Sequence, residues 1–177
     1  RLIRRQRQMC IRDRFKGEPE PELAGRQLQH DRGKTLGGSS SINGMVFIRG
    51  NSLDYEGWRQ MGCDGWGYAD VLPYFKKMES YSGGGDDFRG DSGPLRVHRS
   101  VPKDPLSIAF IKAGKEAGYK ETDDISGYCQ EGFGIFDRTV FKGERWSTTR
   151  GYLDPVRDRE NLTIITKALV CKLNLEN

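Results

Sequence analysis

Apolar side chains recur every three or four positions in three stretches of the chain, which is the spacing of one helix face. These stretches are residues 54–61, 67–79 and 105–118. Asp104 and Pro105 are residue types favoured at the N-cap and in the first turn of a helix. The pattern therefore predicts three short helices. The expected buried side of the third helix holds Ile108, Ala109, Ile111, Ala113 and Ala117.

Alternating apolar and polar residues predict strands between and after these helices. Residues 94–98 alternate in this way, and residues 133–141 are also β-like. Two more strands are expected at residues 162–166 and 169–173. The mixture of short helices and strands predicts an α/β or mixed α+β fold.

Residues 32–50 form the most informative segment, which reads RGKTLGGSSSINGMVFIRG. The Gly37-Gly38 pair allows close approach of the backbone to another group, and serines are good helix N-cap residues. Residues 42–47 are expected to form a short buried turn or helix. Free N–H groups at a helix start favour a phosphate or another electron-rich group. From these residues alone, a polar cofactor site and a plain Gly/Ser loop both stay open.

The composition fits a piece of a larger protein, because 23 glycines in 177 residues and a mean hydropathy of −0.72 indicate many loops. The net charge of +4 comes from the first 14 residues, which hold six arginines and one aspartate. The other 163 residues sum to −1. We interpret residues 1–14 as a non-native basic tail. A functional arm that binds nucleic acid is the alternative.

The cysteines show no metal-binding spacing. Cys10, Cys63, Cys129 and Cys171 form no CxxC pair. We therefore expect free thiols in a reducing compartment and no metal site, with two disulfides as the alternative. No apolar run approaches the roughly 18 residues of a membrane span.

The segment of residues 32–50 resembles the first signature of the glucose–methanol–choline (GMC) flavin oxidoreductases. The shared features are an Arg-Gly-Lys lead-in, Leu-Gly-Gly-Ser-Ser, Asn43 four residues after Ser39, and a closing Arg-Gly. Asp54 and Trp58 follow at the usual offsets. The resemblance runs from Phe15 to the C-terminus and is strongest to the choline-oxidising branch. Further similar stretches are Trp66-Gly67-Tyr68, Leu72-Pro73-Tyr74-Phe75, Gly93-Pro94-Leu95, Glu131-Gly132-Phe133-Gly134 and Arg145-Trp146-Ser147.

This resemblance implies a bound FAD that accepts a hydride at N5 from an alcohol carbon. Val170 matches a family strand that reaches the adenine. Ile42 stands where some relatives attach FAD through a histidine, so the implied binding is non-covalent. The residues that would line the flavin and its pyrophosphate are Gly37, Gly38, Ser39, Ser40, Asn43, Gly44, Met45 and Val46.

The family's glycine-rich GxGxxG motif and its catalytic histidine are not found in this sequence. His98 lies in a predicted strand and is interpreted as a surface or satisfied histidine, so no catalytic residue is assigned here. We therefore expect an internal fragment that is inactive by itself.

The resemblance also implies a division of the chain. Residues 15–60 would belong to the FAD-binding domain, residues 61–157 mainly to the substrate domain and connecting segments, and residues 158–177 again to FAD-domain strands. The expected fold is thus a fragment of a GMC fold, in which parts of a Rossmann-like FAD-binding domain are interleaved with a substrate-binding domain.

The implied activity is oxidation of a small alcohol. Choline, oxidised to betaine aldehyde in glycine betaine synthesis, is the first candidate, and another primary alcohol is the second. A respiratory-chain quinone is the expected electron acceptor, with no nucleic-acid partner and a cytoplasmic or peripherally membrane-associated location. Two alternatives from other classes are a basic-arm nucleic-acid-binding module and a non-catalytic domain that keeps the family fold.

Overall fold

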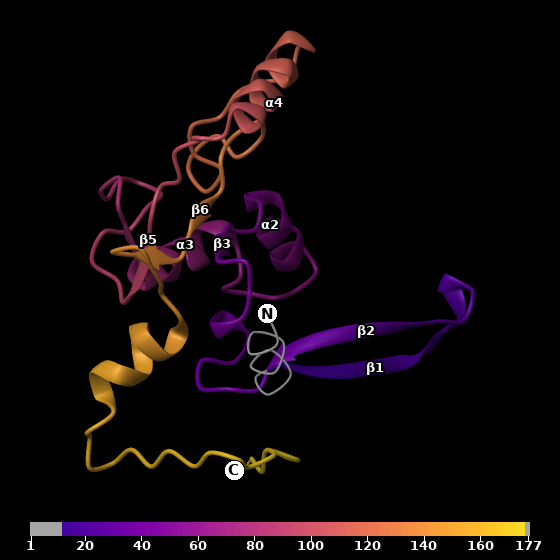
Figure 1. Cartoon of the computed structure of the whole chain (residues 1–177), viewed down its shortest axis with the longest axis vertical. Helices are drawn as coiled ribbons and strands as arrows, with labels where there is room; N and C mark the ends of the chain where they lie inside the picture. The colour runs from indigo at the N-terminus through magenta and orange to yellow at the C-terminus, as the bar shows by residue number, and fades with distance from the viewer. Residues whose placement is uncertain (1–11, 176–177) are drawn as a thin grey trace.

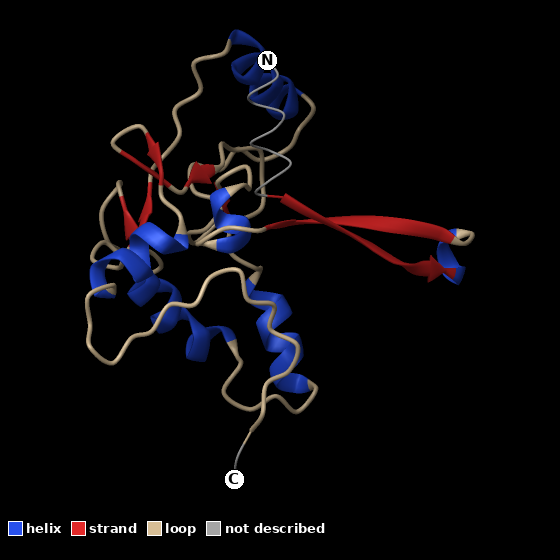
Figure 2. Cartoon of the chain, turned by 60° about the horizontal axis from the view of Figure 1, so that its bottom comes forward, coloured by secondary structure: helices blue, strands red, loops and turns tan. Residues whose placement is uncertain are grey.

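The computed structural model describes residues 12–175, which form short helices and four two-stranded sheets (Figures 1 and 2). The mixed helix and strand content confirms the predicted fold class. Residues 1–11 of the predicted basic tail lie outside the described residues. The strands are β1 (Arg12–Glu20), β2 (Arg26–Gly33), β3 (Val46–Phe47), β4 (Glu79–Tyr81), β5 (Leu95–Val97), β6 (Asp137–Arg138), β7 (Val140–Phe141) and β8 (Glu144–Arg145). The α-helices are α2 (Ser52–Gln60), α3 (Tyr68–Met78) and α4 (Pro105–Glu116).

Strands β1 and β2 form a long antiparallel hairpin, in which Arg12 lies opposite Gly33. The hairpin points away from the other elements in both views (Figures 1 and 2). Its tip turns through Ala24 and Gly25, both at positive φ. Every described side chain of the arm is exposed or half-buried, so the arm has no core of its own.

Helices α2 and α3 are fixed by side chains at their first turns. Asn51 Oδ1 accepts the Leu53 N–H at 2.9 Å, so α2 begins two residues before the predicted start. Glu56 of α2 accepts the Tyr68 N–H at 2.9 Å and thereby joins the two helices. Its hydrogen bond with Arg59, followed by the one from Tyr68, lowers the pKa of the Glu56 carboxyl.

Helix α4 confirms the predicted cap and corrects the predicted buried side. Asp104 Oδ1 accepts the Leu106 N–H at 2.7 Å, as expected of an N-cap. Gly114 is the buried residue of the helix, where an added Cβ would lie 2.5 Å from Phe133. The helix projects from the rest of the chain (Figure 1), and most of its apolar residues are exposed. Of the predicted buried residues, Ile111 is half-buried, whereas Ile108, Ala109, Ala113 and Ala117 are exposed.

The two strands predicted near the C-terminus are absent from the described structure. Residues 157–175 contain turns and extended backbone without strand pairing. A strand needs a hydrogen-bonded neighbour, and no described strand lies alongside this segment. The prediction of two strands at residues 162–166 and 169–173 is therefore wrong.

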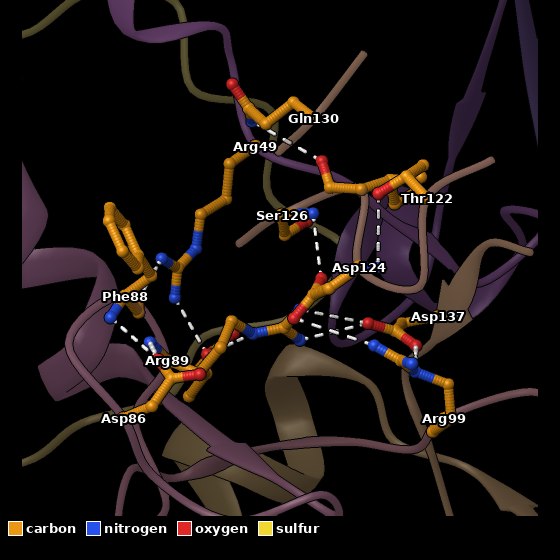
Figure 3. A network of polar contacts seen from close by, with 12 residues as sticks. Arg49, Asp86, Phe88, Arg89, Arg99, Thr122, Asp124, Ser126, Gln130 and Asp137 are labelled. Atoms are coloured by element: carbon orange, nitrogen blue, oxygen red, sulfur yellow. Dashed lines mark hydrogen bonds and ion pairs between the residues drawn. The ribbon is translucent and has the colours of Figure 1, made fainter. Parts of the chain in front are cut away.

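The centre of the packed region is a cluster of charges (Figure 3). Arg89 is fully buried and donates to Glu79 at 2.8 Å, to Asp124 at 2.6 Å and to Asp137 at 3.0 Å. Burial alone would lower the pKa of the Arg89 guanidinium, but the three carboxylates outweigh it and raise that pKa. Tyr81 adds an aromatic face, with its ring centroid 3.8 Å from the guanidinium carbon.

Two further arginines complete this charge cluster. Arg49 Nη2 lies 2.7 Å from Glu79 Oε1, and Arg99 Nε lies 3.1 Å from Asp137 Oδ1. Three positive and three negative side chains therefore balance each other. Balanced pairing is the condition under which charges can be buried in a protein interior.

The loop that presents Arg89 is organised by another carboxylate. Asp86 Oδ1 accepts the backbone N–H groups of Phe88 and Arg89, each at 2.7 Å. Burial alone would raise the pKa of the Asp86 carboxyl, but these two hydrogen bonds and the nearby charges of Arg89 and Lys76 outweigh it, and the pKa is lowered. The ionised form of Asp86 therefore stabilises the turn before the charge cluster.

Candidate functional site

The Gly/Ser segment forms a tight 3-10 turn, η2 (Gly38–Ser41), directly after the root of the hairpin arm. Gly37 and Gly38 have φ values of 84° and 53°, a region that favours glycine. An added Cβ at Gly37 would lie 2.5 Å from Ser41 Oγ, whereas at Gly38 it would meet nothing within 4 Å. Gly37 is therefore needed for packing inside the chain, and Gly38 presents bare backbone to open space.

The three serine hydroxyls hold the turn itself. Ser39 Oγ accepts the Gly33 N–H at 3.2 Å, Ser40 Oγ donates to the Gly37 carbonyl at 2.5 Å, and Ser41 Oγ donates to a carbonyl earlier in the loop at 2.8 Å. At Gly33 an added Cβ would lie 2.1 Å from the Gly38 carbonyl oxygen, so the arm and the turn are in direct contact. The hydroxyls predicted as cofactor partners thus also organise the loop.

Residues 42–47 do not form the predicted short buried turn or helix, because they lead from the turn into strand β3 and only Phe47 is buried. Asn43 Oδ1 accepts the Met45 N–H at 3.0 Å, and Met45 adopts a positive φ of 64°. Val46 pairs with Arg138 of β6 and remains 48% exposed, while Phe47 is buried. An added Cβ at Gly44 would meet nothing within 4 Å. Gly44 and Val46 therefore leave accessible surface a few residues after Gly38 in the sequence.

A segment more than 100 residues away completes the site. Arg145 Nη1 donates to the Ser40 carbonyl at 3.1 Å and to Asn43 Oδ1 at 2.7 Å. The Thr148 N–H donates to Ser40 Oγ at 3.0 Å. Thr149 Oγ1 is buried and has no hydrogen-bond partner within the described part of the chain. Sequence reasoning noted Arg145 in a similar stretch but assigned it no role, because no local pattern links it to the glycine turn.

The remaining predicted residues lie elsewhere. Val170 is 75% exposed in the C-terminal extended segment, and no hydrogen bond among residues 12–175 joins it to the turn. His98 is an exposed residue bridged to Arg138 through backbone atoms, which confirms its interpretation as a surface histidine. Cys63, Cys129 and Cys171 are free and exposed.

Residues 12–175 lack two broader features. No group of His, Cys, Asp and Glu side chains in this range is arranged to hold a metal ion. Within the same range, none of the helices combines the length and the apolar character that crossing a bilayer requires.

Comparison with known families decides the classification. The family model described as GMC oxidoreductase matches residues 20–177. The chain belongs to the GMC oxidoreductase family. This confirms the resemblance drawn from residues 32–50. The matched range also includes the glycine turn and its surroundings.

Similar proteins and structures agree with this assignment. The oxygen-dependent choline dehydrogenase of Sinorhizobium fredii is 50% identical over 163 residues, and that of Brucella anthropi is 51% identical over 162 residues. Each match covers 92% of this chain, and the chain spans about 30% of the length of these relatives. Among solved structures, pyridoxine 4-oxidase from Mesorbium loti matches with a TM-score of 0.85 at 32% identity, covering 94% of this chain and 33% of that one. An FAD-dependent oxidoreductase from Chaetomium thermophilum matches with a TM-score of 0.74 at 27% identity, covering 83% and 28%.

The loop geometry fits a flavin cofactor in two respects. Gly38 and Gly44 leave space where a planar or phosphorylated group can approach the backbone. Thr149 Oγ1, beside Gly37, offers a hydroxyl that no other group of residues 12–175 engages. These features are compatible with FAD, the cofactor named for the Chaetomium thermophilum relative.

Proposed function

We propose that this chain is the part of an FAD-dependent alcohol dehydrogenase that supplies the cofactor loop, with choline as substrate. The observation that carries the proposal is the open Gly38 backbone, held in shape by the serine hydroxyls and Arg145. The 50% identity to oxygen-dependent choline dehydrogenases supports choline as the alcohol. When bound, FAD would supply the acceptor for the hydride that leaves the alcohol carbon.

The proposed cofactor contacts keep the residues expected from the sequence. Ile42 has no nucleophilic side chain, so the proposed binding is non-covalent. Val170 belongs to the proposal only through its resemblance to an adenine-contacting strand. The loop residues proposed to contact FAD are Gly37, Gly38, Ser39, Ser40, Asn43, Gly44, Met45 and Val46.

The division of the chain into domains is part of the same proposal. Residues 15–60 and 158–177 would belong to the FAD-binding domain and residues 61–157 mainly to the substrate domain. The resemblance predicts a quinone as the electron acceptor, whereas the relatives are named oxygen-dependent choline dehydrogenases.

A second candidate substrate is a hydroxymethyl-bearing aromatic alcohol. The structure of pyridoxine 4-oxidase, with a TM-score of 0.85 over 94% of this chain, favours it. Choline and pyridoxine both carry a primary alcohol, so the same loop could serve either reaction. The two candidates differ in the group that must be recognised, a trimethylammonium cation or a pyridine ring.

The test uses a full-length protein that carries this segment. Purified with FAD, it should convert choline to betaine aldehyde, with turnover on pyridoxine at least about tenfold lower, which corresponds to roughly 1.4 kcal/mol of discrimination. Faster turnover of pyridoxine would select the second candidate. Absence of bound flavin and of turnover on both alcohols would refute the proposed function.

A further inference from the structure

We propose that Arg145 and Thr148 are positioning residues that clamp the loop of residues 37–43 into the shape that meets the cofactor. The cofactor half of this inference rests on the proposed function. The mechanical half rests on contacts within the chain alone. The comparisons and the family pattern give neither residue a role.

The Arg145 guanidinium bridges two points of the loop. One nitrogen, Nη1, donates both to the Ser40 carbonyl in the middle of the turn and to Asn43 Oδ1 after its end, at 3.1 and 2.7 Å. Asn43 Oδ1 in turn accepts the Met45 N–H, so Arg145 reaches the strand entry through one acceptor. A single side chain therefore fixes the spacing between the turn and the residues that follow it.

Thr148 holds the other end of the loop. Its backbone N–H donates to Ser40 Oγ at 3.0 Å, and its hydroxyl lies 3.3 Å from the Gly37 carbonyl oxygen. Ser40 Oγ donates to the same carbonyl at 2.5 Å. A closed triangle of hydrogen bonds therefore joins Gly37, Ser40 and Thr148. Gly37 directly precedes Gly38, whose backbone is open.

The charge of Arg145 is directed at the loop. Its neighbour Glu144 pairs with Arg150 instead. Among residues 12–175 no carboxylate lies within ion-pair distance of Arg145, and its side-chain partners there are two uncharged oxygens. Hydrogen bonds from a charged donor are stronger than neutral ones. The guanidinium therefore contributes both a strong contact and a positive charge beside a loop proposed to meet a phosphorylated cofactor.

The clamp is itself anchored. Trp146 Nε1 donates to the Pro94 carbonyl at 2.8 Å, and the Trp146 N–H donates to the Thr139 carbonyl at 2.8 Å. The Trp146 ring also meets Phe141 edge-on, with centroids 5.3 Å apart. Arg145 is thus carried by the β7–β8 hairpin, which is tied to the end of the loop before β5.

The loop depends on this support because its own structure is weak. Short 3-10 turns have poor hydrogen-bond geometry, and glycines at positive φ lose much conformational entropy on folding. Without the clamp, the turn keeps its internal serine bonds and its contact with Gly33. It loses the bonds that set where the Gly38 backbone stands relative to residues 43–46.

The experiment compares four variants of the full-length protein. Arg145→Ala and Thr148→Val each remove side-chain donors, and Thr148→Ser restores the hydroxyl. Arg138→Ala is the matched control, because Arg138 is an exposed arginine of the neighbouring strand β6 and no side-chain bond to it is described in residues 12–175. Two readouts are taken. Amide hydrogen exchange of residues 37–44 is measured without FAD, and the FAD dissociation constant is measured by flavin fluorescence quenching.

We expect Arg145→Ala to raise amide exchange of the loop and the FAD dissociation constant by about tenfold or more, because it removes two hydrogen bonds from a charged donor. Thr148→Val should change both in the same direction by a smaller factor. Thr148→Ser and Arg138→Ala should match the parent. A purely structural role would lower the melting temperature of the FAD-free protein without changing the dissociation constant at temperatures far below melting.

Each result tests a different half of the proposal, either the clamp itself or its role toward the cofactor. Unchanged loop exchange in Arg145→Ala would overturn the clamp. Raised exchange with an unchanged FAD dissociation constant would overturn its role toward the cofactor. A parent protein that binds no FAD would refute the proposed function, while the exchange data would still judge the clamp.

Discussion

Replacing Arg89 by methionine is the most direct test of the buried charge cluster. The side chain has no exposed surface, and it contacts the carboxylates of Glu79, Asp124 and Asp137 at 2.6 to 3.0 Å. Methionine is similar in length and has no donor. The substitution would therefore leave three carboxylates facing two arginines, with Glu79 and Asp137 fully buried.

The expected cost is about 3 kcal/mol of the free energy of unfolding. Removing one partner of a buried ion pair typically costs about 3–5 kcal/mol, because the other charge stays buried without compensation. The lower end applies here, since Glu79 keeps Arg49 at 2.7 Å and Asp137 keeps Arg99 at 3.1 Å. A domain is usually stable by only about 5–15 kcal/mol, so this loss would be large.

Urea denaturation of the parent and the variant measures the loss. The matched control is Arg157→Met, whose ion pair with Asp154 is also 2.6 Å long but has both side chains 45% exposed. Exposed pairs are worth about 0–1 kcal/mol, so this control should change little. If Arg89→Met costs no more than Arg157→Met, the cluster does not hold the fold and the reasoning from burial is wrong.

A double variant tests whether the charges depend on one another. Arg89→Met with Asp137→Asn removes one charge of each sign, so the double variant should be more stable than the summed single losses by about 0.5–3 kcal/mol. Simple additivity of the two losses would show that Asp137 does not rely on Arg89.

Four further outcomes follow from the site and the loops. Gly38→Val should weaken FAD binding by about two orders of magnitude or more, because strain at positive φ of roughly 1–3 kcal/mol adds to a clash with the cofactor. Gly37→Ala should instead lower the melting temperature of the protein, because its Cβ would lie 2.5 Å from Ser41 Oγ; flavin titration and thermal melting separate the two variants. FAD should leave the full-length protein on acid or heat denaturation, because Ile42 cannot form a covalent link, and yellow colour retained on the precipitated polypeptide would contradict this. The lowered pKa of Asp86 means that its carboxylate stabilises the fold fully above the unfolded pKa near 3.9 and loses this effect as pH falls through the folded pKa. Asp86→Asn should therefore lower the urea midpoint at about pH 6, and this difference should shrink as the pH falls below the unfolded pKa.

Local signals in the sequence predicted the helices well. Asp104 and Pro105 mark the start of α4 in the sequence, because a cap and a first-turn proline act on the residues directly after them. The GMC pattern of residues 32–50 likewise identified the family from one continuous segment. Its cofactor residues remain predictions that flavin binding must test.

Packing over long distances in sequence was not predicted. The apolar face of α4 was assigned as buried, yet Gly114 is the residue that meets Phe133. Periodicity says which residues share a face but not whether another element covers that face. The strands expected at residues 162–166 and 169–173 failed for the same reason, because their pattern carries no information on a pairing partner.

The charge cluster and the clamp also escaped sequence reasoning. Arg89 lies 35 residues before Asp124 and 48 before Asp137. Arg145 lies 102 residues after Asn43. Charged residues are common on surfaces, so single arginines and aspartates at such separations give no signal that they meet in the interior.

The hairpin arm contains positions that tolerate substitution and one position that does not. Gln27 and Gln29 on β2 face solvent, so substitutions there should change stability by no more than about 0.5 kcal/mol. Gly33 at the root is different, because any side chain would run into the Gly38 carbonyl oxygen. Exposed positions of the arm can therefore change in sequence, while its base stays a glycine.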